Sequence, residues 1–218
     1  LCLTLALFPV YAEGVTLTFD VTQDTFVREQ DPDMVVHLNP EYPDEINVRI
    51  ATGKNRYIFL KFDVTGITGK TIESAQLVLQ NENREKGNSS FEIYKVSNNW
   101  DQNTITWNNM PPYDDSKVYG DRAQNDIPYK ANEIFYTDID PSFFNSGDGT
   151  YSMVLVSYAG GDDSSFLSKE NTVGGQGPKL IIKLAEGETP AEPEAPAAEP
   201  EAPPAAEPEA PAAEPEAP

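Results

Sequence analysis

Cysteine, histidine and long apolar runs are nearly absent from this 218-residue sequence. The one cysteine, Cys2, cannot form an intrachain disulfide, so an ordinary hydrophobic core must hold the fold together. The one histidine, His37, lies in a predicted loop without the partners of a catalytic triad or a zinc motif. The sequence also has no glycine-rich phosphate loop. We therefore expect a protein that is not an enzyme.

Basic residues are also scarce, because 15 Lys and Arg stand against 36 Asp and Glu, for a net charge of −21. Binding to nucleic acid or to an anionic membrane depends on Lys and Arg that replace counterions. The charge balance therefore excludes both as general partners. It fits a protein that works outside the cell, and one that collects Ca²⁺.

The apolar stretch at the start, residues 1–12, is too short to cross a bilayer, which needs about 20 residues. It ends in Val10-Tyr11-Ala12, whose small residues at both ends suit signal peptidase. Neither a Met nor a basic residue precedes it. We interpret it as the remnant of a signal peptide, rather than as a core strand, and expect a secreted protein without membrane insertion.

Residues 186–218 form a segment of Pro, Ala and Glu in which Ala-Glu-Pro-Glu-Ala-Pro recurs four times. Frequent proline prevents regular helix and sheet, and the like charges repel one another. The composition predicts a disordered, extended linker of roughly 90 Å at ~3.1 Å per residue. The pattern stops without a new domain, so we expect a further domain or an anchor to follow.

Between these ends, residues 13–185 read as strands, since apolar residues recur at period two in short runs broken by Gly, Asn, Asp and Pro. The clearest run is Arg56–Val64, in which the even-numbered residues from Ile58 to Val64 face the core. Met153–Val156 is apolar on both parities, which predicts a strand buried on both faces. Residues 108–132 predict a long surface loop, and Pro141–Phe144 a single helical turn. About ten strands indicate an all-β jelly-roll β-sandwich of two antiparallel sheets.

Two runs can be paired by position. A hairpin through Thr52-Gly53-Lys54, with Gly53 at positive φ, places Arg49 opposite Tyr57 and Glu45 opposite Lys61. In that register the apolar residues of both strands, Ile46 with Leu60 and Val48 with Ile58, face the core together.

Several segments, taken in chain order, resemble the DNRLRE domain, which is similar to carbohydrate-binding module family 96. They are Asp24–Arg28, Arg56–Asp63, Ile72–Leu79, Trp100–Asn108, Ser168–Glu170 and Pro178–Leu180. The resemblance implies a β-sandwich without catalytic activity, an extracellular setting and glycan binding. In some members of this family the ligand is an anionic uronate polymer, which an acidic domain does not attract in general.

For such a ligand, the sequence predicts a site on the outer face of the paired strands. Its members are aromatic, amide or basic residues, which stack on sugar rings, read hydroxyls and bind carboxylates: Arg28, Asn47, Arg49, Tyr57, Lys61 and Lys169. The alternative is that Arg28, Arg49, Lys61 and Glu170 form a structural ion network beneath loops. Both tryptophans, Trp100 and Trp107, are assigned to the fold. Three loop tyrosines remain as candidate stacking residues: Tyr113, Tyr119 and Tyr129.

Four aspartates end or flank predicted strands, where carboxylates and carbonyl oxygens could hold a structural Ca²⁺. They are Asp20, Asp24, Asp63 and Asp138. No EF-hand spacing supports the metal, and aspartate at a strand end is commonly a turn former.

Two functions of different classes remain. The first is a secreted, non-catalytic carbohydrate-binding module that tethers a larger extracellular protein to a polysaccharide. The second is a structural or adhesive module of a cell surface that binds protein partners.

Overall fold

The computed structural model describes residues 14–82, 90–123, 131–160 and 162–185, all within one compact unit. The predicted signal-peptide remnant (1–12), the predicted linker (186–218) and Tyr129 lie outside the described residues.

Strands make up almost all regular structure in this part of the chain, with two short 3₁₀ turns between them. The strands are β1 (Thr16–Asp20), β2 (Gln23–Arg28), β3 (Glu45–Val48), β4 (Arg56–Val64), β5 (Ile72–Gln80), β6 (Phe91–Val96), β7 (Gly120–Arg122), β8 (Ile134–Ile139), β9 (Gly149–Val156), β10 (Ser164–Leu167) and β11 (Lys179–Leu184). The turns are η1 (Val36–Leu38) and η3 (Pro141–Phe144). The prediction of an all-β fold is confirmed.

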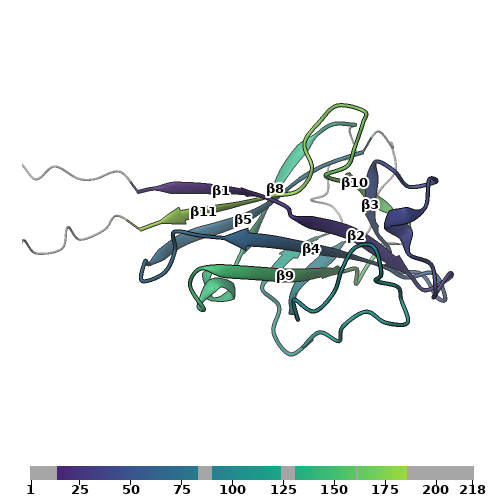
Figure 1. The fold of residues 1–218 in the computed structure, drawn as a ribbon, viewed down its shortest axis with the longest axis horizontal. Coiled ribbons are helices and arrows are strands. Elements are labelled where there is room, and N and C mark those ends of the chain that lie inside the picture. Colours follow the sequence, from purple (N-terminus) through teal and green to yellow (C-terminus); the bar gives the residue numbers. More distant parts are fainter. Residues whose placement is uncertain (1–13, 83–89, 124–130, 161, 186–218) are drawn as a thin grey trace, which may run out of the picture. The chain divides into compact units, whose positions relative to one another are not determined.

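The strands form three antiparallel sheets. Sheet A has the order β1-β11-β5-β8, sheet B the order β2-β4-β9-β6-β7, and sheet C consists of β10 and β3. Figure 1 shows sheet C at one end of the molecule and the short coil that precedes β9 at the other. Two large sheets were predicted and sheet C was not, while the jelly-roll connectivity stays a prediction.

Sheets A and B enclose one hydrophobic core. Leu77, Leu180 and Ile182 of sheet A pack in the same buried cluster as Leu60 and Met153 of sheet B. Strand β4 has the predicted bounds, and its even-numbered residues from Ile58 to Val64 all belong to this core. Period-two alternation therefore identified the inner face of sheet B correctly.

The outer face of sheet B is also covered. A second buried cluster joins Phe59 of β4 and Val154 of β9 to Trp100 and Ile105, which come from the segment after β6. The Phe59 and Trp100 ring centroids are 5.6 Å apart. This cover explains why Met153–Leu155 is buried on both faces, as the sequence predicts, and why the outward side of β4 faces protein and not water.

The predicted hairpin between residues 46–50 and β4 is wrong. Arg49 forms a single bridge with Arg56 and not with Tyr57, and Glu45 pairs with Leu167 of β10 and not with Lys61. Both edges of β4 are occupied by β2 and β9, so β3 has no edge of β4 to join. The turn itself follows the prediction, because Gly53 has φ 67°.

Two smaller expectations concern the connections. Pro141–Phe144 forms the predicted helical turn, where the Asp140 carboxylate accepts a hydrogen bond from the Ser142 backbone N–H. The described part of the predicted 108–132 loop contains one short strand, β7, which extends sheet B.

The Trp100 indole offers a test of the cover on sheet B. Its Nε1–H donates to Ser152 Oγ at 3.0 Å, and both residues are buried. We expect Trp100→Phe to lower the free energy of unfolding by about 2–4 kcal/mol, because it removes packing and leaves the Ser152 hydroxyl without its donor. Urea denaturation measures the loss. The control, Trp107→Phe at a half-exposed position, should cost about 1 kcal/mol or less; equal losses would contradict this account.

Candidate functional site

The six residues predicted to bind a glycan do not share one face. Arg49 pairs across the backbone with Arg56, and Arg56 and Tyr57 are successive residues of β4. Since successive strand residues point to opposite sides, Arg49 lies on the core side of β4 and Tyr57 on the outer side. The predicted site is therefore divided between two surfaces.

The first group is an arginine cluster at the sheet C end. Arg56 donates to Asn47 Oδ1 at 3.0 Å and to Asp163 Oδ2 at 2.8 Å, and Arg49 pairs with the same aspartate at 3.4 Å. Asn47 is fully buried. Burial lowers the pKa of Arg56, and the neighbouring arginines act in the same direction against Asp163. This arrangement matches the structural alternative better than a ligand site.

Arg28 belongs to the same end of the molecule. Its guanidinium donates to the Tyr42 hydroxyl at 2.7 Å, pairs with Asp31 at 3.0 Å, and is buried. A guanidinium with both partners inside the protein is poorly placed to capture an external carboxylate.

The second group lies beneath the Trp100 segment. Tyr57 packs on Trp107 with ring centroids 4.9 Å apart and on Tyr113 at 6.1 Å. Lys61 is buried, donates to the Trp100 carbonyl oxygen at 2.5 Å and lies 4.4 Å from the Trp100 ring centroid. Burial lowers the pKa of Lys61. The prediction that this face is open to a glycan is wrong, because the 97–113 segment covers it.

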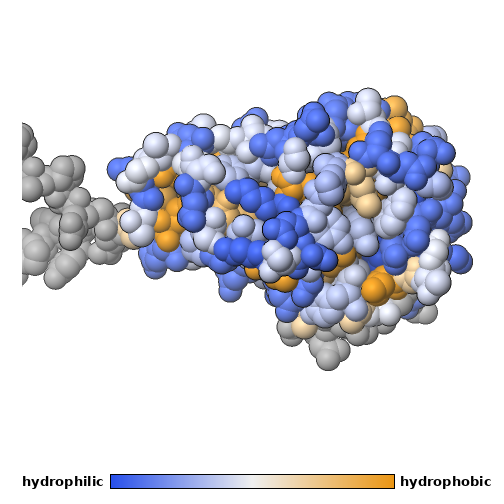
Figure 2. Space-filling view, turned by 90° about the horizontal axis from the view of Figure 1, so that it is seen from below, coloured by the Kyte–Doolittle hydropathy of each residue, from blue (hydrophilic) through white to orange (hydrophobic). Residues whose placement is uncertain are grey.

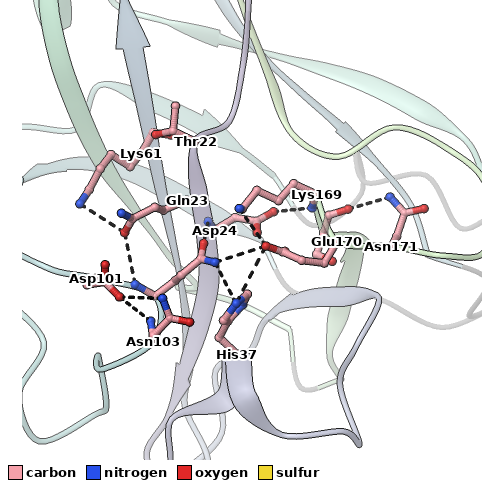
Figure 3. Close-up of polar contacts among 12 residues, drawn as sticks. Thr22, Gln23, Asp24, His37, Lys61, Asp101, Asn103, Lys169, Glu170 and Asn171 are labelled. Carbon is pink, nitrogen blue, oxygen red and sulfur yellow. Dashed lines mark hydrogen bonds and ion pairs between the residues drawn. The ribbon is translucent and has the colours of Figure 1, made fainter.

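Lys169 belongs to a polar network that joins four separate segments (Figure 3). Its backbone N–H donates to Asp24 Oδ2 at 2.8 Å, and its ammonium pairs with Glu170 at 2.9 Å. Gln102 adds contacts to His37 at 2.8 Å and to Glu170 at 3.3 Å. The network ties β2, η1 and the loop after β10 to the Trp100 segment, so it holds the cover of sheet B in place.

Asp24 and Glu170 are a coupled carboxyl pair within this network. Burial and then the charge of Glu170 raise the pKa of Asp24 well above its ordinary value. Burial opposes ionisation of Glu170 too, but hydrogen bonds from Lys169 and Asp24 outweigh it and lower the pKa of Glu170. Asp24 Oδ1 is buried and has no N–H or O–H donor. The opposite directions of the two pKa shifts favour a proton on Asp24 rather than on Glu170.

The four aspartates predicted to hold calcium are not brought together. Asp20 pairs with Lys179, Asp63 accepts from Thr150 Oγ1, and Asp138 accepts from Gln76 Nε2, while Asp24 lies in the network. Across residues 14–82, 90–123, 131–160 and 162–185, no group of three or more His, Cys, Asp or Glu side chains is placed to hold a metal ion.

Three depressions among the described residues, of about 440, 380 and 290 Å³, lie at η3 and at the segments near it, and we call them together the η3 rim. The last two share Lys95, Val96 and Ser97 at the end of β6. The first is formed by residues 67–72 and by η3 with the residues after it. In Figure 1 the short coil before β9, which is η3, lies toward the other end of the fold from sheet C.

Lysines are concentrated in the η3 rim, since Lys70, Lys95 and Lys117 are three of the eight lysines in the described ranges. Lys95 is half-buried and donates to the Phe143 carbonyl oxygen at 2.9 Å, with its ammonium above the rings of Phe143 and Tyr151. Burial and then Lys117 lower the pKa of Lys95. Within the described ranges Lys95 has no carboxylate at ion-pairing distance, although the chain is strongly acidic.

Asp148 shapes one wall of the rim. Its carboxylate accepts the backbone N–H groups of Gly66, Ile67 and Thr68 at 2.8–2.9 Å. These hydrogen bonds lower the pKa of Asp148 to about 2. The carboxylate therefore fixes the loop after β4, and hydrogen bonds from amides keep it ionised beside the depression that it lines.

On the face shown in Figure 2, hydrophobic residues lie in separate small groups among hydrophilic ones. None of the helical segments in the described ranges is long and apolar enough to pass through a membrane.

The model of carbohydrate-binding module family 96 matches residues 15–184, which include every described strand. The chain belongs to this family.

A curated relative of this family 96 chain is a gellan lyase from a Bacillus species. The two are 25% identical over 194 residues, which are 85% of this chain and 7% of the relative. The chain thus spans a small fraction of that protein's length.

Sequence reasoning missed the η3 rim of the family 96 module. Lys95 continues the apolar alternation of β6 after Phe91 and Ile93, at a place where the pattern predicts a core residue. A lysine at such a position is a signal of function or of a sheet end, and it could have been noted. The convergence of residues 67–72, 112–119 and 141–149 on one place depends on the fold.

The Asp24–Glu170 pair gives a prediction about pH. A raised pKa means that folded Asp24 keeps its proton at a pH where Asp24 of the unfolded chain ionises. Asp24 therefore lowers the free energy of unfolding increasingly as pH rises above the ordinary pKa of 3.8. The side-chain amide of Asp24→Asn can still accept the Lys169 backbone N–H and can donate to the Glu170 carboxylate. We expect the Tm of this variant to rise relative to that of the native chain as pH increases from 5 to 8. Thermal unfolding across this range is the measurement, with the exposed Asp63→Asn as control. A Tm difference that does not change with pH would contradict the raised pKa of Asp24.

Proposed function

We propose that the chain is a secreted, non-catalytic module that holds a larger extracellular protein on a polysaccharide, and that the polysaccharide carries carboxylates and binds at the η3 rim. Family membership supports carbohydrate binding. The observation that carries the choice of site and charge is Lys95, a half-buried ammonium without a carboxylate partner in the described ranges, open to two adjoining depressions.

A carboxylated sugar would supply what Lys95 lacks. An ammonium bound only to a carbonyl oxygen keeps donors for a charge-assisted hydrogen bond, which is stronger than a neutral one. Lys70 lines the first depression, and Lys117 lines the second, where it pairs with Asp140 at 3.5 Å. The lack of a carboxylate partner for Lys95 in the described ranges answers the objection that an acidic domain repels a polyanion, because screening limits the effect of distant charges to about 8 Å in physiological salt.

The relative suggests the first polymer to test. Gellan is an anionic polysaccharide, and the relative is named for acting on it. Catalysis is not part of the proposal, because the coupled carboxyl pair Asp24–Glu170 is engaged in the network that fixes the Trp100 segment. Release of new reducing ends from gellan by the purified chain would contradict the non-catalytic assignment.

Removal of the Lys95 charge tests the proposed site. We expect Lys95→Ala to weaken binding to gellan about tenfold or more, and binding by the native chain to weaken as NaCl rises from 50 to 500 mM. Isothermal titration calorimetry with gellan fragments measures both effects. The matched control is Lys54→Ala. Lys54 is exposed in the turn before β4, whereas the rim residues 67–72 follow the end of that strand.

Two results would overturn the proposal. Unchanged affinity in a Lys70→Ala, Lys95→Ala and Lys117→Ala triple variant would remove the η3 rim as the site. Failure of the native chain to bind gellan, alginate, pectate or neutral polymers would remove polysaccharide binding as the function.

A further inference from the structure

The outer face of sheet A differs from every other broad surface described above. Its outward residues alternate with core residues along all four strands, and most of them are exposed: Thr16, Thr18, Asp20, Ser74, Ile134, Tyr136, Asp138 and Lys183. The outer face of sheet B is covered by the Trp100 segment. Sheet A therefore presents much of its outer face to the solvent, except at Val78 and Gln80 of β5, which are buried.

Two large apolar side chains stand exposed on this face, next to each other on β8. Tyr136 is 50% exposed and Ile134 is 43% exposed. Together they give this face an exposed aromatic ring with an aliphatic side chain beside it. The cross-strand neighbour of Tyr136 is Val78, which is buried although it points outward. Side chains around Val78 thus cover it and give Tyr136 a packed surrounding.

Fixed polar groups lie beside Tyr136. Asp138 is two residues further along β8, on the same face, and its Oδ1 accepts a hydrogen bond of 2.8 Å from Gln76 Nε2 on β5. The amide and the carboxylate hold each other in place and retain free donor and acceptor positions. An aromatic ring beside oriented amide and carboxylate groups is the combination that recognises a sugar, through stacking on its C–H face and hydrogen bonds to its hydroxyls.

The charges on this face select a neutral ligand. Lys179 pairs with Asp20, and Lys183 pairs with Glu73 at 2.9 Å, so both lysines of the face have carboxylate partners. Asp138 adds a negative charge. Unlike the η3 rim with Lys95, the face offers no unpaired ammonium to a carboxylated sugar, and a carboxylate near Asp138 would be repelled.

We propose that the outer face of sheet A is a second saccharide-binding surface, which takes a neutral sugar stacked on Tyr136 and hydrogen-bonded to Gln76 and Asp138. It rests on the proposed function only in taking a polysaccharide as the ligand. The module would then contact a polymer at two surfaces of different charge preference, and simultaneous binding would raise the overall affinity beyond that of either surface.

Carboxyl-reduced gellan, in which each carboxylate is converted to an alcohol, is the probe for this surface, with the whole 218-residue chain as the protein. We expect the native chain to bind it with little dependence on NaCl. Tyr136→Ala should weaken this binding about tenfold or more, whereas Tyr136→Phe, which keeps the ring, should retain it. The matched control is Tyr158→Ala, since Tyr158 is 42% exposed in the loop after β9.

The two proposals fail separately. Binding of native gellan that depends on Lys95, together with no binding of carboxyl-reduced gellan, would overturn the second surface and leave the proposed function standing. Unchanged affinity of Tyr136→Ala for carboxyl-reduced gellan, with Tm within a few degrees of the native chain, would also overturn it. Loss of that affinity in Lys95→Ala but not in Tyr136→Ala would assign the neutral polymer to the η3 rim instead.

Discussion

The burial of sheet B on both faces is the constraint on which the other features depend. A sheet in a two-layer sandwich usually leaves one face to water. In this chain the Trp100 segment covers that face, with Phe59 and Val154 as its floor. The cover requires anchors, and these are the Trp100–Ser152 hydrogen bond, the buried ammonium of Lys61 and the network around Asp24 and Glu170.

This cover decides which residues can meet a ligand. Aromatic and basic side chains that look suited to a sugar, such as Tyr57 and Lys61, are used to fasten the Trp100 segment. The surfaces proposed for recognition lie outside the covered face of sheet B. These are the concave η3 rim, where sheet B meets the turn that follows β8, and the flat outer face of sheet A. The first offers the ammonium of Lys95, which has no carboxylate partner in the described ranges, and the second offers a ring beside an oriented amide and carboxylate.

Sequence alone predicted the local parts of this fold and failed at the long-range parts. The alternation in Arg56–Val64, the positive φ of Gly53 and the turn at Pro141–Phe144 depend on neighbouring residues, and each is confirmed. The hairpin failed because the partner of a strand is set by competition for edges. Strand β4 is taken by β2 and β9, whereas β3 finds β10 more than 100 residues later in the chain.

The candidate site failed for the same reason. Period-two alternation tells which residues share a side of a strand, but it does not tell whether another segment lies over that side. The pattern therefore placed Tyr57 and Lys61 correctly on the outward side of β4, but this side contacts the Trp100 segment and not the solvent. Lys95 was passed over because its importance comes from three segments that converge on it from distant positions. Motif resemblance identified the family correctly, since it depends on residue order and not on exposure.

Strand β11 has a mechanical consequence. It is the last described strand, and it lies between β1 and β5, with antiparallel pairing on both edges. Ladder hydrogen bonds run perpendicular to the strands. Tension applied lengthwise to β11 from the chain after Leu184 would shear both ladders at once, so that many bonds must rupture together instead of opening one after another.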